Sequence, residues 1–118
     1  MHAVIFEVHP RKDLKDDYLA LAAELRPELE TIDGFISVER FASLTEEGKI
    51  LSLSFWRDED TIKRWRAHAR HQAAQHQGRS ALFADYRLRI AAVVRDYGMF
   101  ERDEAPQDMP SVARRAAE

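Results

Sequence analysis

The sequence contains no cysteine, and its 118 residues include only four glycines and four prolines. The absence of cysteine excludes disulfide bonds, thiol catalysis and zinc sites built on cysteine. No apolar run approaches the roughly 20 residues that a membrane-spanning helix needs. The first ten residues, MHAVIFEVHP, also lack the basic start and the long apolar core of a secretory signal. These absences lead us to expect a cytoplasmic protein without a membrane partner.

The sequence also lacks a large excess of positive or negative charge. It contains 18 Lys and Arg residues and 21 Asp and Glu residues, so the formal net charge is −3. A nucleic-acid-binding domain is normally basic, so we expect no nucleic-acid partner. The composition, 45% hydrophobic and 33% charged, fits one globular domain. We place this domain at residues 1–99. Residues 100–118 contain two prolines, many charges and no apolar stripe, which predicts a tail that is mobile or packed on a partner subunit.

The apolar residues recur with two periods along the chain. Alternation predicts strands at 3–9, 35–41, 50–56 and 88–95, while steps of three and four predict helices at about 13–32 and 58–77. Pro27 lies inside the first helical stripe, and we expect it to kink the helix. The order β-α-β-β-α-β is that of the ferredoxin-like α+β fold, an antiparallel sheet with both helices on one face.

The four predicted strands divide into an apolar face and a mixed face. We expect the helices to cover the apolar set, which is Val4, Phe6, Val8, Ile36, Val38, Leu51, Leu53, Phe55, Leu88, Ile90 and Ala92. The mixed face then exposes Phe35, Phe41, Ile50 and Trp56, more apolar surface than a solvated face needs. Two such faces packed together would form a homodimer.

Trp65 and His76 lie on the same side of the second predicted helix. One interpretation places them in a pocket between helices and sheet, with Trp65 as a wall and His76 as a proton carrier or an axial ligand. The other makes Trp65 a core residue and His76 a helix-end residue that complements the dipole; we favour it on the sequence alone. His68, His71 and His76 follow the spacing H-x2-H-x4-H, but His71 points away from His76 and His68 lies on the flank. We therefore expect no metal site.

Arginines on the mixed face of the last strand lie opposite acidic residues. Arg87, Arg89 and Arg95 could bind an anion together, but such charges more often pair across strands with residues such as Glu7 and Glu39.

Several motifs together resemble the antibiotic biosynthesis monooxygenase (ABM) domain family. They are SFWRDEDTIKRWR at 54–66, HQAAQ at 71–75, Gly78-Arg79, YRLRI at 86–90 and RDY at 95–97. The resemblance covers roughly residues 2 to 98 and implies a dimeric α+β barrel with a pocket between sheet and helices. Some members of the family oxygenate polycyclic phenols to quinones with O₂ and no cofactor, and some degrade haem. Others are isomerases or have no established activity.

The resemblance implies a small monooxygenase that acts without a cofactor on an aromatic or quinone-like molecule. Its catalytic residues would be Trp65, His76 and His71, and its substrate pocket would be lined by Phe6, Val38, Phe55, Trp65, Gln75 and His76. Two alternatives stay open. One is a haem-binding or haem-degrading protein, and the other is a non-catalytic dimeric module that binds a small molecule or contributes structure.

Efficient haem degradation is not expected. The haem-degrading relatives use an Asn on the first strand, a Trp on the second long helix and a His about three turns further on. Trp65 matches, but Phe6 stands at the Asn position and Gln75 at the His position. His76 comes one place later, and one residue rotates a side chain by roughly 100° around a helix. That rotation matters because a ring nitrogen must reach the iron at bond length.

Overall fold

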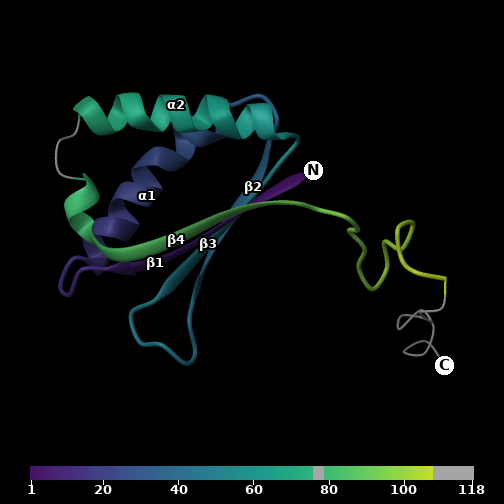
Figure 1. Cartoon of the computed structure of the whole chain (residues 1–118), viewed down its shortest axis with the longest axis horizontal. Helices are drawn as coiled ribbons and strands as arrows, with labels where there is room; N and C mark the ends of the chain where they lie inside the picture. The colour runs from purple at the N-terminus through teal and green to yellow at the C-terminus, as the bar shows by residue number, and fades with distance from the viewer. Residues whose placement is uncertain (76–78, 108–118) are drawn as a thin grey trace.

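The structure of the chain is a computed structural model that describes residues 1–75 and 79–107, with side chains described outside 70–80. Its elements are β1 (His2–Pro10), α1 (Lys15–Glu30), β2 (Phe35–Ala42), β3 (Ile50–Trp56), α2 (Glu59–Gln75), the 3₁₀ helix η1 (Arg79–Leu82) and β4 (Phe83–Ala92). The four strands form one antiparallel sheet in the order β2-β3-β1-β4. Both helices lie on the same side of it (Figure 1). The predicted ferredoxin-like α+β fold is confirmed.

The turn between α1 and β2 is tied to the start of α2. Gly34 has a φ of +97°, and a Cβ on it would lie 2.5 Å from the Thr61 hydroxyl oxygen, so only glycine fits there. Asp58 accepts a hydrogen bond from the Thr61 backbone N–H at 2.8 Å and caps α2. Arg57 joins the two corners through an ion pair to Asp33 at 3.1 Å. These contacts fix where α2 begins above the sheet.

The first helix begins two residues later than the predicted start at residue 13. Asp13 has a φ of +71° and does not cap the helix, and α1 begins at Lys15 without a side-chain cap. Pro27 lies inside α1, as expected. The helix buries Tyr18, Ala22 and Leu29.

The prediction for the two faces of β3 is wrong. Ile50 and Trp56 are only 4% and 2% exposed, and they belong to the core beneath the helices. Ser52 and Ser54 are buried on the same face. Leu51, Leu53 and Phe55 face the other side and are half-buried. We call the side under the helices the covered face and the opposite side the open face.

The reversal has a physical reason. Alternation separates two sets of side chains but does not say which set meets the helices. Trp56 fills the space between Leu29, Val38 and Ile62, and its indole N–H donates to the Ser54 hydroxyl at 2.8 Å. A buried serine is tolerated when its hydroxyl is hydrogen-bonded. The set of β3 residues that contains the two serines, Ser52 and Ser54, therefore forms part of the core.

The last strand begins earlier than predicted. The 3₁₀ helix η1 ends at Leu82, and β4 pairs with β1 from Phe83 onward, whereas the predicted strand starts at residue 88. The Phe83 ring packs at 5.6 Å from Tyr18 and 5.8 Å from Phe6, which favours the extended backbone that brings these rings together.

Beyond β4 the chain forms an arm, residues 93–107, that leaves the body of the protein (Figure 1). It is anchored where the Val93 N–H donates to the Met1 carbonyl at 2.9 Å. The domain boundary that we place after residue 99 stays a prediction. Within residues 1–75 and 79–107, no helix has the length and the apolar character needed to cross a membrane.

Candidate functional site

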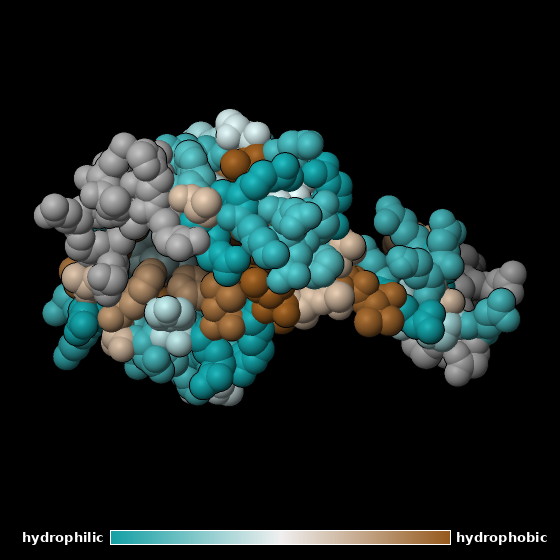
Figure 2. Space-filling view, turned by 45° about the horizontal axis from the view of Figure 1, so that its top comes forward, coloured by the Kyte–Doolittle hydropathy of each residue, from teal (hydrophilic) through white to brown (hydrophobic). Residues whose placement is uncertain are grey.

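The helices leave one margin of the covered face open. Tyr86, Leu88 and Ile90 of β4 pair with Val8, Phe6 and Val4 of β1, so they face the helix side. Tyr86 is nevertheless 59% exposed and Leu88 48% exposed. Figure 2 shows hydrophobic surface as a band below the hydrophilic surface of the upper part of the molecule. We call this uncovered apolar strip of the sheet, between α2 and β4, the cleft, and its apolar residues the floor.

Aromatic rings line one end of this floor. Phe6 contacts Phe83 and Tyr86 at centroid distances of 5.8 and 5.5 Å, and Phe83 contacts Tyr18 at 5.6 Å. All three contacts are edge-to-face, the geometry that aromatic pairs favour. The rings come from β1, α1 and the start of β4. A flat organic molecule would find further aromatic edges there.

Trp65 of α2 borders the cleft, because it packs against the same core cluster as Ile90 of β4, and His68 lies beside it on the same helix. Trp65 is half-buried and packs against the core cluster that includes Trp56 and Ile62. The His68 ring stacks on Trp65 at 5.4 Å with an interplanar angle of 28°. Its Nε2 lies 3.3 Å from the Glu28 carboxylate on α1. The three residues form a tryptophan, an imidazole and a carboxylate in a row across the two helices.

This arrangement suits proton transfer. A carboxylate that holds one ring nitrogen fixes the orientation and the tautomer of an imidazole, and leaves the other nitrogen for exchange with a substrate. From the sequence alone, His68 lies on the flank of the helix and has no evident role. Its partner Glu28 lies 40 residues earlier in another helix, so no local spacing reveals the pair.

The predicted pocket residues have different outcomes. Phe6 and Trp65 lie on the covered face at the cleft. Val38 is on the same face but buried in the core at 7% exposure. Phe55 pairs with Ala3 on the open face, so its placement in a pocket under the helices is wrong. His71, Gln75 and His76 lie outside the described side chains, and their roles stay predictions.

The described residues of the cleft do not fit a haem. Phe6 offers no hydrogen-bond donor at the floor, and the Nε2 of His68 is directed to Glu28. Within the described part of the chain, no three His, Asp or Glu side chains gather as a metal would require.

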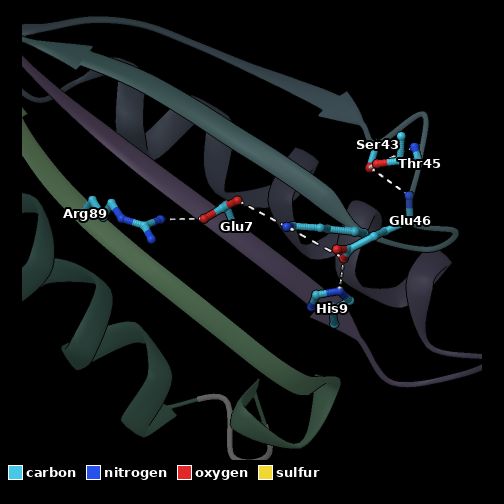
Figure 3. A network of polar contacts seen from close by, with 7 residues as sticks. Glu7, His9, Ser43, Thr45, Glu46 and Arg89 are labelled. Carbon is cyan, nitrogen blue, oxygen red and sulfur yellow. Dashed lines mark hydrogen bonds and ion pairs between the residues drawn. The ribbon is translucent and has the colours of Figure 1, made fainter.

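The open face carries a network of ion pairs (Figure 3). Glu7 contacts Arg89 at 2.6 Å and Lys49 at 3.2 Å. Glu46 extends the network from Lys49 to His9, whose Nε2 it meets at 3.1 Å. The hydrogen bond from Arg89, with that from Lys49, holds the pKa of Glu7 below its ordinary value. The expected pairing of arginines across strands is thus confirmed for Arg89.

A recess of about 310 Å³ lies beside this network, lined by Glu7, His9, Lys49, Asp85, Tyr86, Arg87 and Arg89. Every residue of this lining except Tyr86 belongs to the open face or its margin. The recess is polar and lies across the sheet from the cleft, so it is not the pocket predicted between helices and sheet.

Comparison with known proteins identifies the family. The family model for antibiotic biosynthesis monooxygenase matches residues 1–77. The chain is 53% identical over 93 residues to the jasmonate monooxygenase ABM of Pyricularia oryzae, a match that covers 79% of this chain and 43% of that protein. It is 39% identical over 62 residues to YqjZ of Bacillus subtilis, covering 52% of this chain and 53% of YqjZ. The chain therefore matches only about half the length of these relatives.

Solved structures agree on the fold. The haem degrader MhuD of Mycobacterium tuberculosis superposes with a TM-score of 0.69 at 16% identity, over 83% of this chain and 100% of MhuD. Rv0793 of the same organism gives 0.69 at 18% identity, over 82% of this chain and 98% of its own. At these identities the likeness concerns the fold alone. The family model, which covers more than half of the sequence, shows that this chain belongs to the antibiotic biosynthesis monooxygenase family.

Proposed function

We propose that this chain is a monooxygenase that oxidises a flat aromatic or quinone-like molecule in the cleft, without a metal or an organic cofactor. The observation that carries the proposal is the row Trp65–His68–Glu28, whose tryptophan packs against the same core cluster as Ile90 of the apolar floor. Trp65 and the aromatic cluster would hold the rings of the substrate. His68 would accept a proton from it, and Glu28 would orient His68.

The reaction balances without an external reductant when the substrate is a polycyclic phenol or its keto tautomer. Loss of a proton to His68 gives an electron-rich anion that can transfer an electron to O₂. One oxygen atom ends as a ring carbonyl in place of two hydrogens, and the other leaves with those hydrogens as water. The substrate supplies all the electrons, and the protein supplies burial, orientation and the proton acceptor.

The relative from Pyricularia oryzae bears the name of another substrate, jasmonate. Jasmonate therefore belongs in the substrate panel beside the phenols. Hydroxylation of a saturated carbon by O₂ needs two further electrons, so this arm of the assay requires an added reductant such as NADH. If jasmonate is the only compound in the panel that is oxidised, and only when the reductant is added, jasmonate would replace the phenol as the proposed substrate.

We further propose that two copies pair through their open faces as a homodimer. Of the four residues expected to be exposed on that face, Ile50 and Trp56 are buried and Phe35 packs against the core cluster, so only the expectation for Phe41 holds. The open face nevertheless presents Ile5, Leu51, Leu53 and Phe55, which are half-buried, and Phe41, which is 42% exposed. An apolar group of this size beyond the reach of the helices suits a second sheet packed about 10 Å away.

The test compares two histidines that each meet a carboxylate. His68→Gln removes the proposed base; His9→Gln removes the histidine that meets Glu46 on the open face. O₂ consumption and product formation are measured on a panel of hydroxynaphthalenes, anthrones and jasmonate. We expect His68→Gln to lower kcat by roughly 100-fold or more, and His9→Gln to leave it unchanged. Equal rates for the two variants would remove His68 from the mechanism, and a parent protein inactive on every compound would overturn the proposed activity.

A further inference from the structure

Three polar side chains between the helices and the sheet have no hydrogen-bond partner in the described part of the chain. Arg40 of β2 lies directly opposite Ser52 of β3, so the two side chains share the covered face. Ser52 is 8% exposed and Tyr18 of α1 is 5% exposed, and neither hydroxyl makes a hydrogen bond with a described residue. The Nε of Arg40 is buried and is also without a partner. Polar groups at residues this deeply buried normally find a partner within the protein.

The positive charge of Arg40 is not balanced by a carboxylate. Its guanidinium carbon lies 6.0 Å from the centroid of the Tyr18 ring, and no acidic side chain among the described residues forms an ion pair with it. By contrast, Arg26, Arg57 and Arg89 each meet a carboxylate. Arg40 is half-buried, and the aromatic face offsets only part of the cost of taking a cation out of water. A guanidinium held in this way is suited to receive an anion.

The surroundings of Arg40 select the kind of anion. A planar guanidinium offers parallel N–H donors that match the two oxygens of a carboxylate. Among the unpartnered polar atoms of Arg40, Ser52 and Tyr18, only the Arg40 Nε is fully buried, so the two terminal nitrogens are left to receive a ligand. Tyr18 belongs to an apolar cluster with Val8 and Ile50. One positive charge beside apolar side chains favours a singly charged acid with an apolar body over a phosphate dianion.

We propose that Arg40 and Ser52 bind the carboxylate of a small organic acid on the covered face, at the margin between α1 and β2. The terminal nitrogens of Arg40 donate to the two carboxylate oxygens, the Ser52 hydroxyl donates to one of them, and the Tyr18 ring supports the guanidinium. The sheet order β2-β3-β1-β4 puts β2 at an edge, so the ligand enters from that side. The cleft borders β4 at the other edge. This second site therefore does not depend on the proposed reaction.

The first experiment follows the binding of benzoate to the full chain by NMR titration at constant ionic strength. Benzoate carries no phenol that the proposed reaction could oxidise, and benzamide is its uncharged counterpart. We expect Arg40→Gln to weaken benzoate binding about tenfold or more and to leave benzamide unaffected, because the charged, paired hydrogen bonds are lost. Arg87→Gln removes an arginine of the open face that also has no described partner, and it should change nothing. Equal benzoate affinity in Arg40→Gln and the parent overturns the site, and tighter binding of phosphate overturns the ligand class.

The second experiment separates a ligand-binding arginine from a structural one by thermal unfolding. Without ligand, Arg40→Gln should unfold at or above the Tm of the parent, because an unbalanced, half-buried charge is removed. Benzoate should raise the Tm of the parent and not that of the variant, since only a protein that binds the acid is stabilised by it. Arg40→Lys keeps the charge but not the paired donors, and it should bind benzoate severalfold more weakly than the parent. A large fall in the Tm of Arg40→Gln, with no response of the parent to benzoate, would overturn the proposal and make Arg40 structural.

Discussion

The two faces of the sheet use the same four strands in different ways. On the covered face, Val8, Ile50 and Trp56 are all but inaccessible to water, and the serines between them are buried too. On the open face, apolar residues such as Leu53 and Phe55 stay half-buried, and ion pairs join the strands at one end. The comparison teaches that the burial of a residue in this sheet depends on whether a helix covers its face, and less on how apolar the residue is.

The comparison also separates two kinds of energy. Interactions on the covered face stabilise the monomer, because they connect helices to strands. The apolar residues of the open face contribute little until a second surface covers them. Substitutions on the two faces should therefore change different measured quantities, and the following predictions run from the largest expected effect to the smallest.

Two adjacent aromatic residues of β3, one on each face of the sheet, should differ most in their effect on stability when each is replaced by alanine. Trp56→Ala should lower the free energy of unfolding by roughly 3–5 kcal/mol, because it opens a void among Leu29, Val38 and Ile62. Phe55→Ala should cost the monomer much less, since one side of that ring already meets solvent. Urea unfolding, at a protein concentration below the dimer dissociation constant, measures the free energy of unfolding of both variants. Equal losses would contradict the assignment of the two faces.

A charge on the open face should act on association instead. Leu53→Arg should weaken the dimer by about 100-fold or more, because an arginine would be desolvated between two sheets. The circular dichroism spectrum should stay that of the parent protein. Light scattering at micromolar concentration measures the change in mass. A dimer that survives this substitution unchanged would place the interface elsewhere.

The buried serine that supports Trp56 should give an intermediate effect. Ser54→Ala leaves the indole N–H without the acceptor that it now reaches at 2.8 Å. A buried donor without a partner costs roughly 1–3 kcal/mol, so the free energy of unfolding should fall by that amount. Ser37→Ala, at an exposed position of β2, is the matched control and should change little. An unchanged stability in Ser54→Ala would mean that the indole finds another acceptor.

The smallest effect concerns the corner that positions α2 over the covered face. Hydrogen bonds from the Thr61 hydroxyl and backbone lower the pKa of Asp58 from 3.8 to about 2. Because the folded pKa is the lower one, the stabilisation is present above pH 4 and is lost as the pH falls from 3.8 toward 2. Asp58→Asn keeps a capping oxygen but does not titrate. The stability difference between parent and variant, followed by urea unfolding, should therefore shrink over that pH range.

The sequence predicted some parts of the site and not others, for identifiable reasons. Trp65 was found because its spacing from Ile62 repeats the helical period and because the family pattern includes it. His68 was given no role because its meaning depends on Glu28, which α1 brings across from 40 residues earlier. Phe55 was placed under the helices because an alternating strand looks the same in either phase.

What the sequence determined by itself is the order and type of the elements. Apolar periodicity, Gly34 at a turn with positive φ and Asp58 at a helix start are local features, and they fix a βαββαβ chain with two amphipathic helices. Only the tertiary structure decided which phase of β3 meets those helices and which histidine meets a carboxylate. Both depend on how large side chains fill the space between distant segments. The bulk of Trp56 and the hydrogen bond that its indole finds set the phase of β3, and the crossing of α1 and α2 sets the partner of His68.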